Sequence, residues 1–171
     1  MGERRRNQIK MINLSVCSAM GVPILFRARN PEYVISIMES TDRIRETVPG
    51  KILWSAKHFA FCFKDSPVAT MPGAPTREDV KDLVKTGREL FPPGATTSAL
   101  IHCSSGMSRS PAAAFIFFCI HFGSNREEQA AVRTTICCEQ NIVVPNKLMI
   151  EYADELLHRN GEMLKQRDTF G

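Results

Sequence analysis

The segment between residues 98 and 123 restricts the possible folds more than any other part of the sequence. Ser98–His102 is short and mostly apolar, which is typical of a buried strand. Small residues follow over Cys103–Arg109. Ser110-Pro111 then begins a very apolar stretch that we expect to be a helix ending near Gly123, because proline is favoured at the first helical positions. This order of strand, loop and helix requires a sheet that is covered by helices.

Three further segments are rich in β-branched and aromatic residues and are expected to be strands: Ile12–Cys17, Tyr33–Met38 and His58–Phe63. Helices are expected to follow the third of them. We therefore predict an α/β fold with a central, mostly parallel sheet of about four to five strands and helices on both faces.

Capping signals mark three of the expected helices. Thr76 and Asp79 form a capping box at the start of one helix, which Pro92-Pro93-Gly94 ends. A similar pair, Ser124 and Glu127, predicts a helix that runs to about Cys138. Pro145-Asn146 begins a final amphipathic helix, with Gly161 past its end.

Length and composition place the chain among ordinary single-domain proteins. Of its 171 residues, 43% are hydrophobic and 23% are charged, which argues against disorder and coiled coil. We expect a polar, basic, flexible tail over residues 1–10 and one domain over residues 11–171. The net charge of +4 is too small to indicate nucleic acid, and the longest apolar run, Phe115–Ile120, is too short to span a membrane.

The cysteines point to a reducing compartment. Six of them occur without any C-x-x-C spacing, so we expect reduced thiols in a cytoplasmic protein, with neither a disulfide framework nor structural zinc. Residues 11–26 follow a short basic run, but their apolar side chains alternate with polar ones. That alternation favours a strand over a signal peptide.

The small-residue loop carries the chemistry. A loop between a buried strand and a helix N-terminus can direct several backbone N–H groups at one anion, and the helix dipole adds partial positive charge. Arg109 can complete such a site, because its planar guanidinium matches two phosphate oxygens. Cys103 is the side chain placed to attack a bound phosphorus, and the same donors would stabilise its thiolate.

The sequence His102-Cys103-Ser104-Ser105-Gly106-Met107-Ser108-Arg109-Ser110 resembles the H-C-x5-R-S signature of the cysteine-dependent protein tyrosine phosphatases. Its G-x-S-R-S ending is most similar to the dual-specificity branch and to small bacterial-type members. The resemblance covers roughly residues 57–160 and includes Val144-Pro145-Asn146. The first 50 residues match no motif of the family.

The resemblance implies a role for each residue of the signature. Cys103 would be the nucleophile, and Arg109 would hold the phosphate together with the backbone N–H groups of Ser104, Ser105, Gly106, Met107, Ser108 and Arg109 itself. Ser110 would hydrogen-bond the thiolate, His102 would orient the loop, and Asn146 would brace it. An N-cap role for Ser110 or Asn146 and a buried, satisfied His102 are nearly as compatible with the sequence.

The family also uses an aspartate on an upstream loop as general acid. The candidates are Asp65, Asp79 and Asp82, and Asp79 is expected to be occupied by its capping box. Asp65 closes a strand and precedes the Pro/Gly-rich loop 65–75, so we favour it as the acid over a simple turn residue before Pro67.

The implied function is hydrolysis of phosphotyrosine in proteins through a phosphocysteine, with phosphoserine and phosphothreonine left open. The expected partners are a phosphorylated protein or peptide and a phosphate or sulfate anion in the loop; no metal, organic cofactor, nucleic acid or membrane is required, and the oligomeric state is not indicated. Three alternatives remain: a phosphoinositide or small-molecule phosphatase, a catalytically weak phosphate-binding module, and a sulfurtransferase. The absence of lysine from residues 103–109 disfavours highly charged head groups.

Overall fold

A parallel sheet forms the centre of the molecule. The computed structural model describes residues 10–50, 52 and 56–170, so the expected tail lies outside the described residues except for Lys10. Within these residues the sheet has four strands in the order β1-β4-β2-β3, all parallel. The strands are β1 (Asn13–Ser18), β2 (Tyr33–Met38), β3 (Lys57–Cys62) and β4 (Ser98–Cys103). Each lies within one residue of its predicted bounds, and the predicted α/β class is confirmed.

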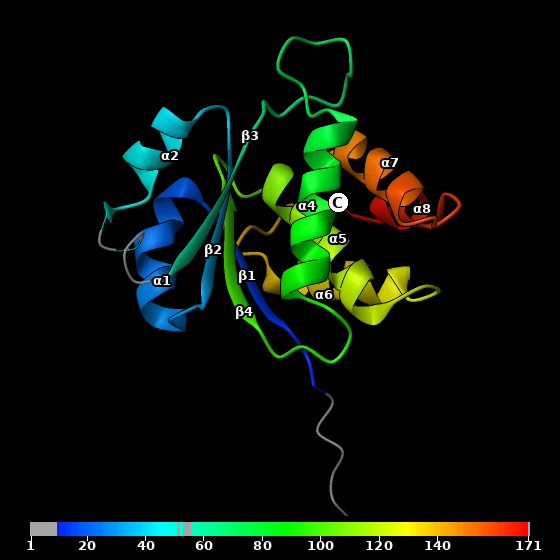
Figure 1. Cartoon of the computed structure of the whole chain (residues 1–171), viewed down its shortest axis with the longest axis horizontal. Coiled ribbons are helices and arrows are strands. Elements are labelled where there is room, and N and C mark those ends of the chain that lie inside the picture. The colour runs from blue at the N-terminus through cyan, green and yellow to red at the C-terminus, as the bar shows by residue number, and fades with distance from the viewer. Residues whose placement is uncertain (1–9, 51, 53–55, 171) are drawn as a thin grey trace, which may run out of the picture.

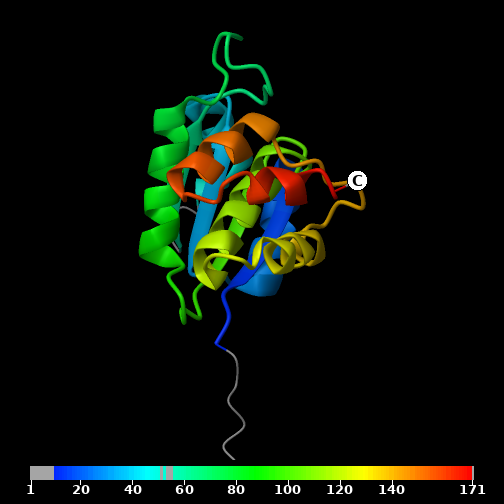
Figure 2. The same ribbon diagram turned by 90° about the vertical axis from the view of Figure 1, so that its right-hand side faces the viewer.

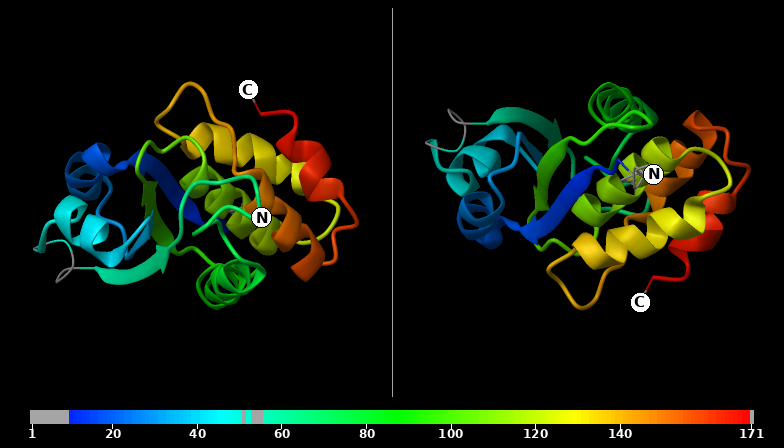
Figure 3. Two further views of the ribbon diagram at one scale, coloured as in Figure 1. Left: turned by 90° about the horizontal axis from the view of Figure 1, so that it is seen from above. Right: turned by 90° about the horizontal axis from the view of Figure 1, so that it is seen from below.

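Helices cover both faces of the sheet (Figure 1). The 3-10 turn η1 (Ala19–Gly21), α1 (Val22–Arg29) and α2 (Thr41–Thr47) lie on one face. The other face carries α4 (Arg77–Leu90), α5 (Arg109–Phe122), α6 (Glu127–Cys137), α7 (Lys147–Leu156) and α8 (Glu162–Arg167). Figure 2 shows this second layer in front of the sheet, and both views of Figure 3 show the two layers on opposite sides. None of the described helices combines the length and apolar character that a membrane span needs.

Helix α5 is the centre of the larger layer. Its residues from Arg109 to His121 are buried, and it packs against β1, β4, α4, α6 and α7. The sequence of α5 is apolar on every face because neighbouring elements cover this helix from every side. Its first turn starts directly after the loop that follows β4.

The helix predicted to run to about Cys138 is present as α6, and two of the three predicted capping signals are confirmed. At α4 the Thr76 hydroxyl accepts from the backbone N–H of Asp79, and the Asp79 carboxylate accepts from that of Thr76. At α7 the Asn146 side chain accepts from the backbone N–H of Met149. The capping box of Ser124 and Glu127 is wrong, because Arg126 is the N-cap of α6 and makes no side-chain cap bond.

The chain beyond α7 also departs from the prediction. Helix α7 is not the final helix: it ends at Leu156, and α8 follows. Gly161 is the N-cap of α8, with a left-handed φ of 87°, and its backbone N–H donates to Asp154. Helices α1 and α2 were not predicted, since each spans no more than eight residues and buries only one of them.

The parallel arrangement brings all four strand ends to one edge of the sheet. The segments that leave this edge include η1, the residues around Glu39, the loop 63–75 and the loop 103–109. The loop between β3 and α4 projects beyond the sheet at the top of Figure 1. Ligand sites of open parallel sheets lie at this edge, so the candidate chemistry of the 103–109 loop is in the expected place.

Candidate active site

The 103–109 loop packs tightly against the end of β1. Gly106 has a φ of +75°, and a Cβ there would lie 2.6 Å from the carbonyl carbon of Cys17 and 2.7 Å from the nitrogen of Ser18. Only glycine fits that space and that backbone conformation. The backbone N–H of Ala19, the first residue of η1, also donates to the carbonyl of Ser104 at 3.2 Å, so the end of β1 and the start of η1 both contact the loop.

Cys103 lies at the bottom of the loop, beside the N-terminus of α5. Its side chain is 1% exposed, and its Sγ accepts from the backbone N–H of Gly106 at 3.3 Å and from the Ser110 hydroxyl at 3.1 Å. Both donors meet this sulfur at the N-terminus of α5, where the helix dipole adds partial positive charge. This is the position expected for the candidate nucleophile.

Arg109 is the first residue of α5 and is only 2% exposed. Its Nη1 donates to the carbonyl of Phe63 at 2.8 Å, and its Nη2 donates to the Ser104 hydroxyl at 3.0 Å and to Glu39 Oε1 at 3.2 Å. Its Nε is buried and has no partner among the described residues. The guanidinium is therefore fixed in place, and its Nε–H and its second Nη1–H donate to no atom of the described residues.

Glu39 is a site residue that sequence reasoning missed. It follows β2, and its carboxylate accepts from both Arg109 and the Ser104 hydroxyl. Burial acts to raise the pKa of Glu39, but hydrogen bonds from its own backbone, from Arg109 and from Ser104, together with the Arg109 charge, outweigh burial and lower it. Its position at the end of the strand next to β4 is the signal that could have found it.

Asp65 lies against the rim of the loop. Its Oδ1 accepts from the Ser108 hydroxyl at 2.7 Å and from Asn146 Nδ2 at 2.8 Å. Asn146 also donates to the carbonyl of Ser66 at 3.1 Å, so it ties the upstream loop to the start of α7. Asp79 is occupied by its capping box, whereas Asp82 lies exposed on α4. Of the three aspartates, Asp65 makes the hydrogen bond to the 103–109 loop.

His102 lies beneath the loop and is fully buried. Its Nε2 shares the Ser36 hydroxyl with Nε2 of His58, at 2.6 Å and 2.8 Å respectively. Burial lowers the pKa of His102 to about 4, and the charges of His58 and Arg109 act in the same direction. His102 is therefore neutral at pH 7, which suits a residue that orients the loop rather than one that moves protons.

The rest of the loop borders the segment that leads into α7. The Met107 carbonyl accepts from the backbone N–H of Val144 at 2.9 Å, and the Ser108 carbonyl accepts from that of Asn146 at 3.2 Å. The Ser105 hydroxyl accepts from the Met107 N–H at 3.3 Å. A groove of about 390 Å³, which we call the rim groove, lies here and reaches Lys147 and Arg167.

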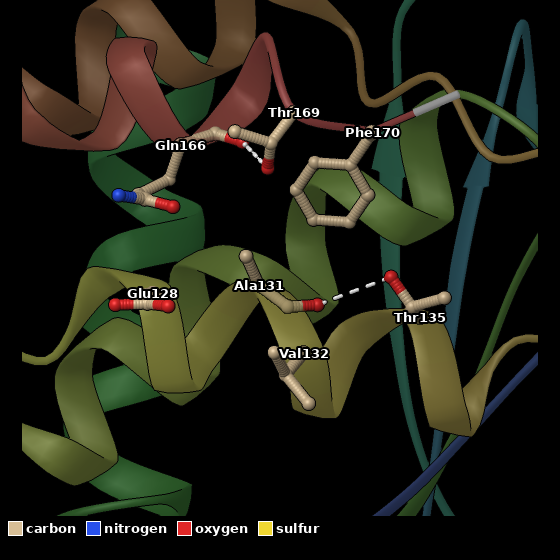
Figure 4. A pocket seen from close by; sticks show the side chains of 7 residues that line it. All are labelled: Glu128, Ala131, Val132, Thr135, Gln166, Thr169 and Phe170. Carbon is tan, nitrogen blue, oxygen red and sulfur yellow. Dashed lines mark hydrogen bonds between the residues drawn. The ribbon is translucent and has the colours of Figure 1, made fainter.

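A second hollow lies between α6 and α8, away from the sheet edge at which the four strands end (Figure 4). It holds about 280 Å³, and Glu128 is the one ionisable side chain in its lining. The hydroxyls of Thr135 and Thr169 donate to carbonyls of their own helical segments. This hollow carries no nucleophile with an activating partner, so the 103–109 loop remains the candidate site. Nowhere in the described part of the chain do three potential metal ligands come together.

Of three comparisons with known proteins, the one with solved structures finds similar folds. Neither the protein-family models nor the curated proteins give a match. Among solved structures, the human tyrosine phosphatase-like serine/threonine/tyrosine-interacting protein has a TM-score of 0.59 at 14% identity, over 84% of this chain and 90% of that one. Human DUSP28 has a TM-score of 0.59 at 13% identity, over 85% and 88%. PTPMT1 in complex with PI(5)P has a TM-score of 0.54 at 16% identity, over 92% and 94%.

The chain therefore has the fold of the cysteine-dependent protein tyrosine phosphatases, in the form shared by the dual-specificity enzymes. The structural similarity extends well beyond residues 57–160, where the sequence resemblance was found, and so it includes much of the N-terminal region that carries no motif.

Proposed function

We propose that this protein is a phosphatase that hydrolyses phosphotyrosine in proteins through a phosphocysteine intermediate. The observation that carries the proposal is the environment of Cys103 Sγ, which accepts from the Gly106 N–H and the Ser110 hydroxyl at the N-terminus of α5. Arg109 is buried beside it with an unpartnered Nε. A nucleophile and anion donors thus meet at one point.

The reaction has two displacements at phosphorus. In the first, the Cys103 sulfur forms a bond to phosphorus while the bond to the tyrosine oxygen breaks, and Asp65 gives that oxygen its proton. Arg109 and the backbone N–H groups of the loop hold the three equatorial oxygens as charge develops. In the second, Asp65 takes a proton from water, whose oxygen attacks phosphorus. Cys103 leaves as a thiolate that accepts from Ser110, and inorganic phosphate is released.

The burial of the nucleophile is compatible with phosphotyrosine as the main substrate. Cys103 is 1% exposed, whereas Met107 on the rim is 36% exposed. A recessed sulfur favours the longer phosphotyrosine side chain over phosphoserine and phosphothreonine. Because Ser104, Ser105, Met107 and Ser108 fill the positions where phosphoinositide phosphatases usually carry lysine, the loop offers less charge to a polyphosphorylated head group than such enzymes do.

The test of this proposal compares the wild type with Cys103→Ser. The wild type should hydrolyse an aryl phosphate and a phosphotyrosine peptide, and faster than the matched phosphoserine peptide. Cys103→Ser should lose turnover but still bind inorganic phosphate, because Arg109 and the loop N–H groups remain. Turnover by Cys103→Ser close to that of the wild type would exclude the mechanism, and a wild type that binds phosphate without turnover would indicate the binding module instead.

A second variant tests the general acid. Asp65→Asn should lower kcat on phosphotyrosine by roughly 10²–10⁴, the usual effect of general acid–base catalysis. The loss should shrink for aryl phosphates whose leaving group needs little protonation. Asp82→Asn is the control, since its side chain lies exposed on α4. If Asp65→Asn turned over every substrate as the wild type does, another group would have to be the acid.

A further inference from the structure

The rim groove joins the candidate active site to a surface that the phosphotransfer chemistry does not use. Asp65, Ser108 and Asn146 belong both to its lining and to the acid end of the site. Since Asp65 must reach the leaving oxygen, the chain of a bound substrate that flanks this oxygen would pass next to the groove. The groove is therefore placed to contact residues near the phosphorylated one.

Backbone hydrogen bonds join two walls of the groove. The N–H of Val144 donates to the Met107 carbonyl, and the N–H of Asn146 donates to the Ser108 carbonyl, so the 103–109 loop and the segment before α7 are joined by two backbone hydrogen bonds. Met107, Val144 and Pro67 give the lining an apolar part, and all three are at least partly open to solvent. A preformed site of this kind binds without first having to order its own backbone.

Two cations distinguish this lining. Lys147, at the first position of α7, and Arg167, at the last position of α8, both line the groove. The guanidinium of Arg167 is oriented by a bond from Nε to the carbonyl of Pro145 at 3.0 Å. Its Nη2 makes no hydrogen bond within the described part of the chain. A positioned guanidinium and a nearby ammonium are complementary to an anionic side chain.

We propose that the rim groove binds an anionic side chain, a carboxylate or a second phosphate, that lies within a few residues of the phosphotyrosine in a substrate peptide. The assignment rests on the proposed function, since it concerns the peptide around the reacting residue. The apolar part of the lining covers the side chain between the phosphotyrosine and the anionic residue. Lys147 and Arg167 pair with the anion.

Carboxylates of the protein itself limit the size of the effect. Glu151 lies 3.8 Å from Lys147 Nζ, and Asp168 lies 3.1 Å from Arg167 Nη1. Both carboxylates are solvent-exposed to a large degree, with side-chain exposures of 39% and 71%, so a substrate anion can compete with them. Exposed ion pairs are individually weak, which predicts a preference of about threefold to tenfold in kcat/KM rather than an absolute requirement.

The experiment uses one phosphotyrosine peptide in which a single glutamate is moved through the three positions on each side, against an all-alanine version. Wild-type kcat/KM should rise at one position and stay flat elsewhere, and phosphoserine at that position should raise it further. The dissociation constants of the same peptides for Cys103→Ser should show the same preference. Equal values at every position would overturn the inference.

Charge variants assign the effect to the groove. Lys147→Glu should abolish or invert the preference for the acidic peptide, and Lys147→Ala should reduce it. Glu151→Gln should increase it about twofold, because the competing carboxylate is removed. Lys165→Glu is the matched control, since Lys165 lies on α8 with a side chain that is 70% exposed and outside the groove. Equal responses of Lys147→Glu and Lys165→Glu would show a general charge effect and overturn the assignment.

The outcome is separable from the test of the proposed function. Hydrolysis of a small aryl phosphate requires the 103–109 loop but no flanking peptide. An enzyme that turns over the aryl phosphate and shows no positional preference would overturn the inference alone. An enzyme that hydrolyses neither the aryl phosphate nor any peptide would fail the proposed function.

Discussion

Arg109 and Arg159 are both buried arginines, and their hydrogen bonds follow the same plan. Arg109 gives one terminal nitrogen to the carbonyl of Phe63 and the other to Glu39. Arg159 gives one to the carbonyl of Cys119 and the other to Glu127. In each case Nε is buried and unpartnered within the described residues. The two arginines differ in the distance and the exposure of the carboxylate that each one binds.

The Glu127 carboxylate is 2.7 Å from Arg159, and its side chain is only 6% exposed. The Glu39 carboxylate is 3.2 Å from Arg109, is 39% exposed, and is shared with the Ser104 hydroxyl. A closed, dry pair must stay intact, because either charge alone would be buried without compensation. A looser pair at the surface can yield to another anion. The comparison therefore separates an arginine that holds α6 in place from one that is available to a substrate.

Among substitutions in the two pairs, Arg109→Lys should give the largest effect, and it should act on catalysis. A lysine keeps the charge but cannot reproduce the planar fork, so kcat/KM should fall by about 10²–10³, the usual loss when one transition-state donor is removed. Arg109 makes three hydrogen bonds and a lysine can replace only some of them, so the free energy of unfolding, measured in urea, should fall by about 1–2 kcal/mol. A protein that unfolded much more easily at nearly normal activity would make Arg109 a second structural arginine.

Glu127→Gln should act on stability instead. The change leaves Arg159 buried beside a neutral amide, so the free energy of unfolding should decrease by about 3 kcal/mol, the lower end for breaking a buried pair. Activity per folded molecule should stay at the wild-type value, since Glu127 lies at the start of α6 and makes no contact with the loop. Urea denaturation followed by fluorescence, with kcat measured on the same samples, checks both parts. A large loss of kcat in the folded variant would contradict the separation.

The free energy of unfolding should also depend on pH, because His102 is buried beneath the 103–109 loop. Between pH 6.5 and pH 4 the unfolded chain binds a proton at His102 that the folded chain does not bind, because burial holds the folded pKa near 4. Stability is thus complete above pH 6.5 and decreases as the pH falls. Lowering the pH from 6.5 to 5 should reduce the free energy of unfolding by about 1.6 kcal/mol, because the full slope of ~1.4 kcal/mol per pH unit applies only once the unfolded imidazole is mostly protonated. His58 contributes in the same direction, because burial lowers its pKa too. His102→Asn should flatten the profile, and an unchanged slope would mean that other groups set it.

Local patterns predicted the parts of the molecule that local contacts decide. The capping box of Thr76 and Asp79 formed because both partners lie in one turn. The equally good pattern of Ser124 and Glu127 failed because Arg159, 32 residues further on, takes the carboxylate. An ion pair between distant segments leaves no signal in the spacing of either residue.

The site shows the same division. Cys103, Arg109 and Ser110 lie within one short stretch, so the residues themselves indicated an anion site there, and the family resemblance supplied Asp65 and Asn146, which are 81 residues apart. Ser36 lies in the adjacent strand β2 and Glu39 directly follows it, and neither residue was found. They could have been found only from the order β1-β4-β2-β3, which places β2 beside β4, and this order is not written in the periodicity of any strand.

Glu39→Gln is the closest counterpart of Glu127→Gln and should give the smallest effect. The Glu39 side chain is partly exposed and solvent screens its charge, so the free energy of unfolding should change by less than about 1 kcal/mol. The substitution removes a negative charge from Arg109 Nη2 and leaves an amide oxygen that still accepts a hydrogen bond. Inorganic phosphate would then meet less repulsion, and its inhibition constant should fall by about threefold, in the range of one exposed charge pair.

The direction in which Glu39→Gln changes the inhibition constant of phosphate shows which role the Glu39 carboxylate has. If Glu39 competes with the substrate for Arg109, its removal improves phosphate binding. If it holds the guanidinium in the orientation that phosphate needs, its removal weakens binding, and the pair at Arg109 would then be as structural as the pair at Arg159. Ser104→Ala separates the two, because Ser104 also accepts from Nη2 but carries no charge. Orientation predicts weaker phosphate binding in both variants, whereas competition predicts tighter binding in Glu39→Gln alone.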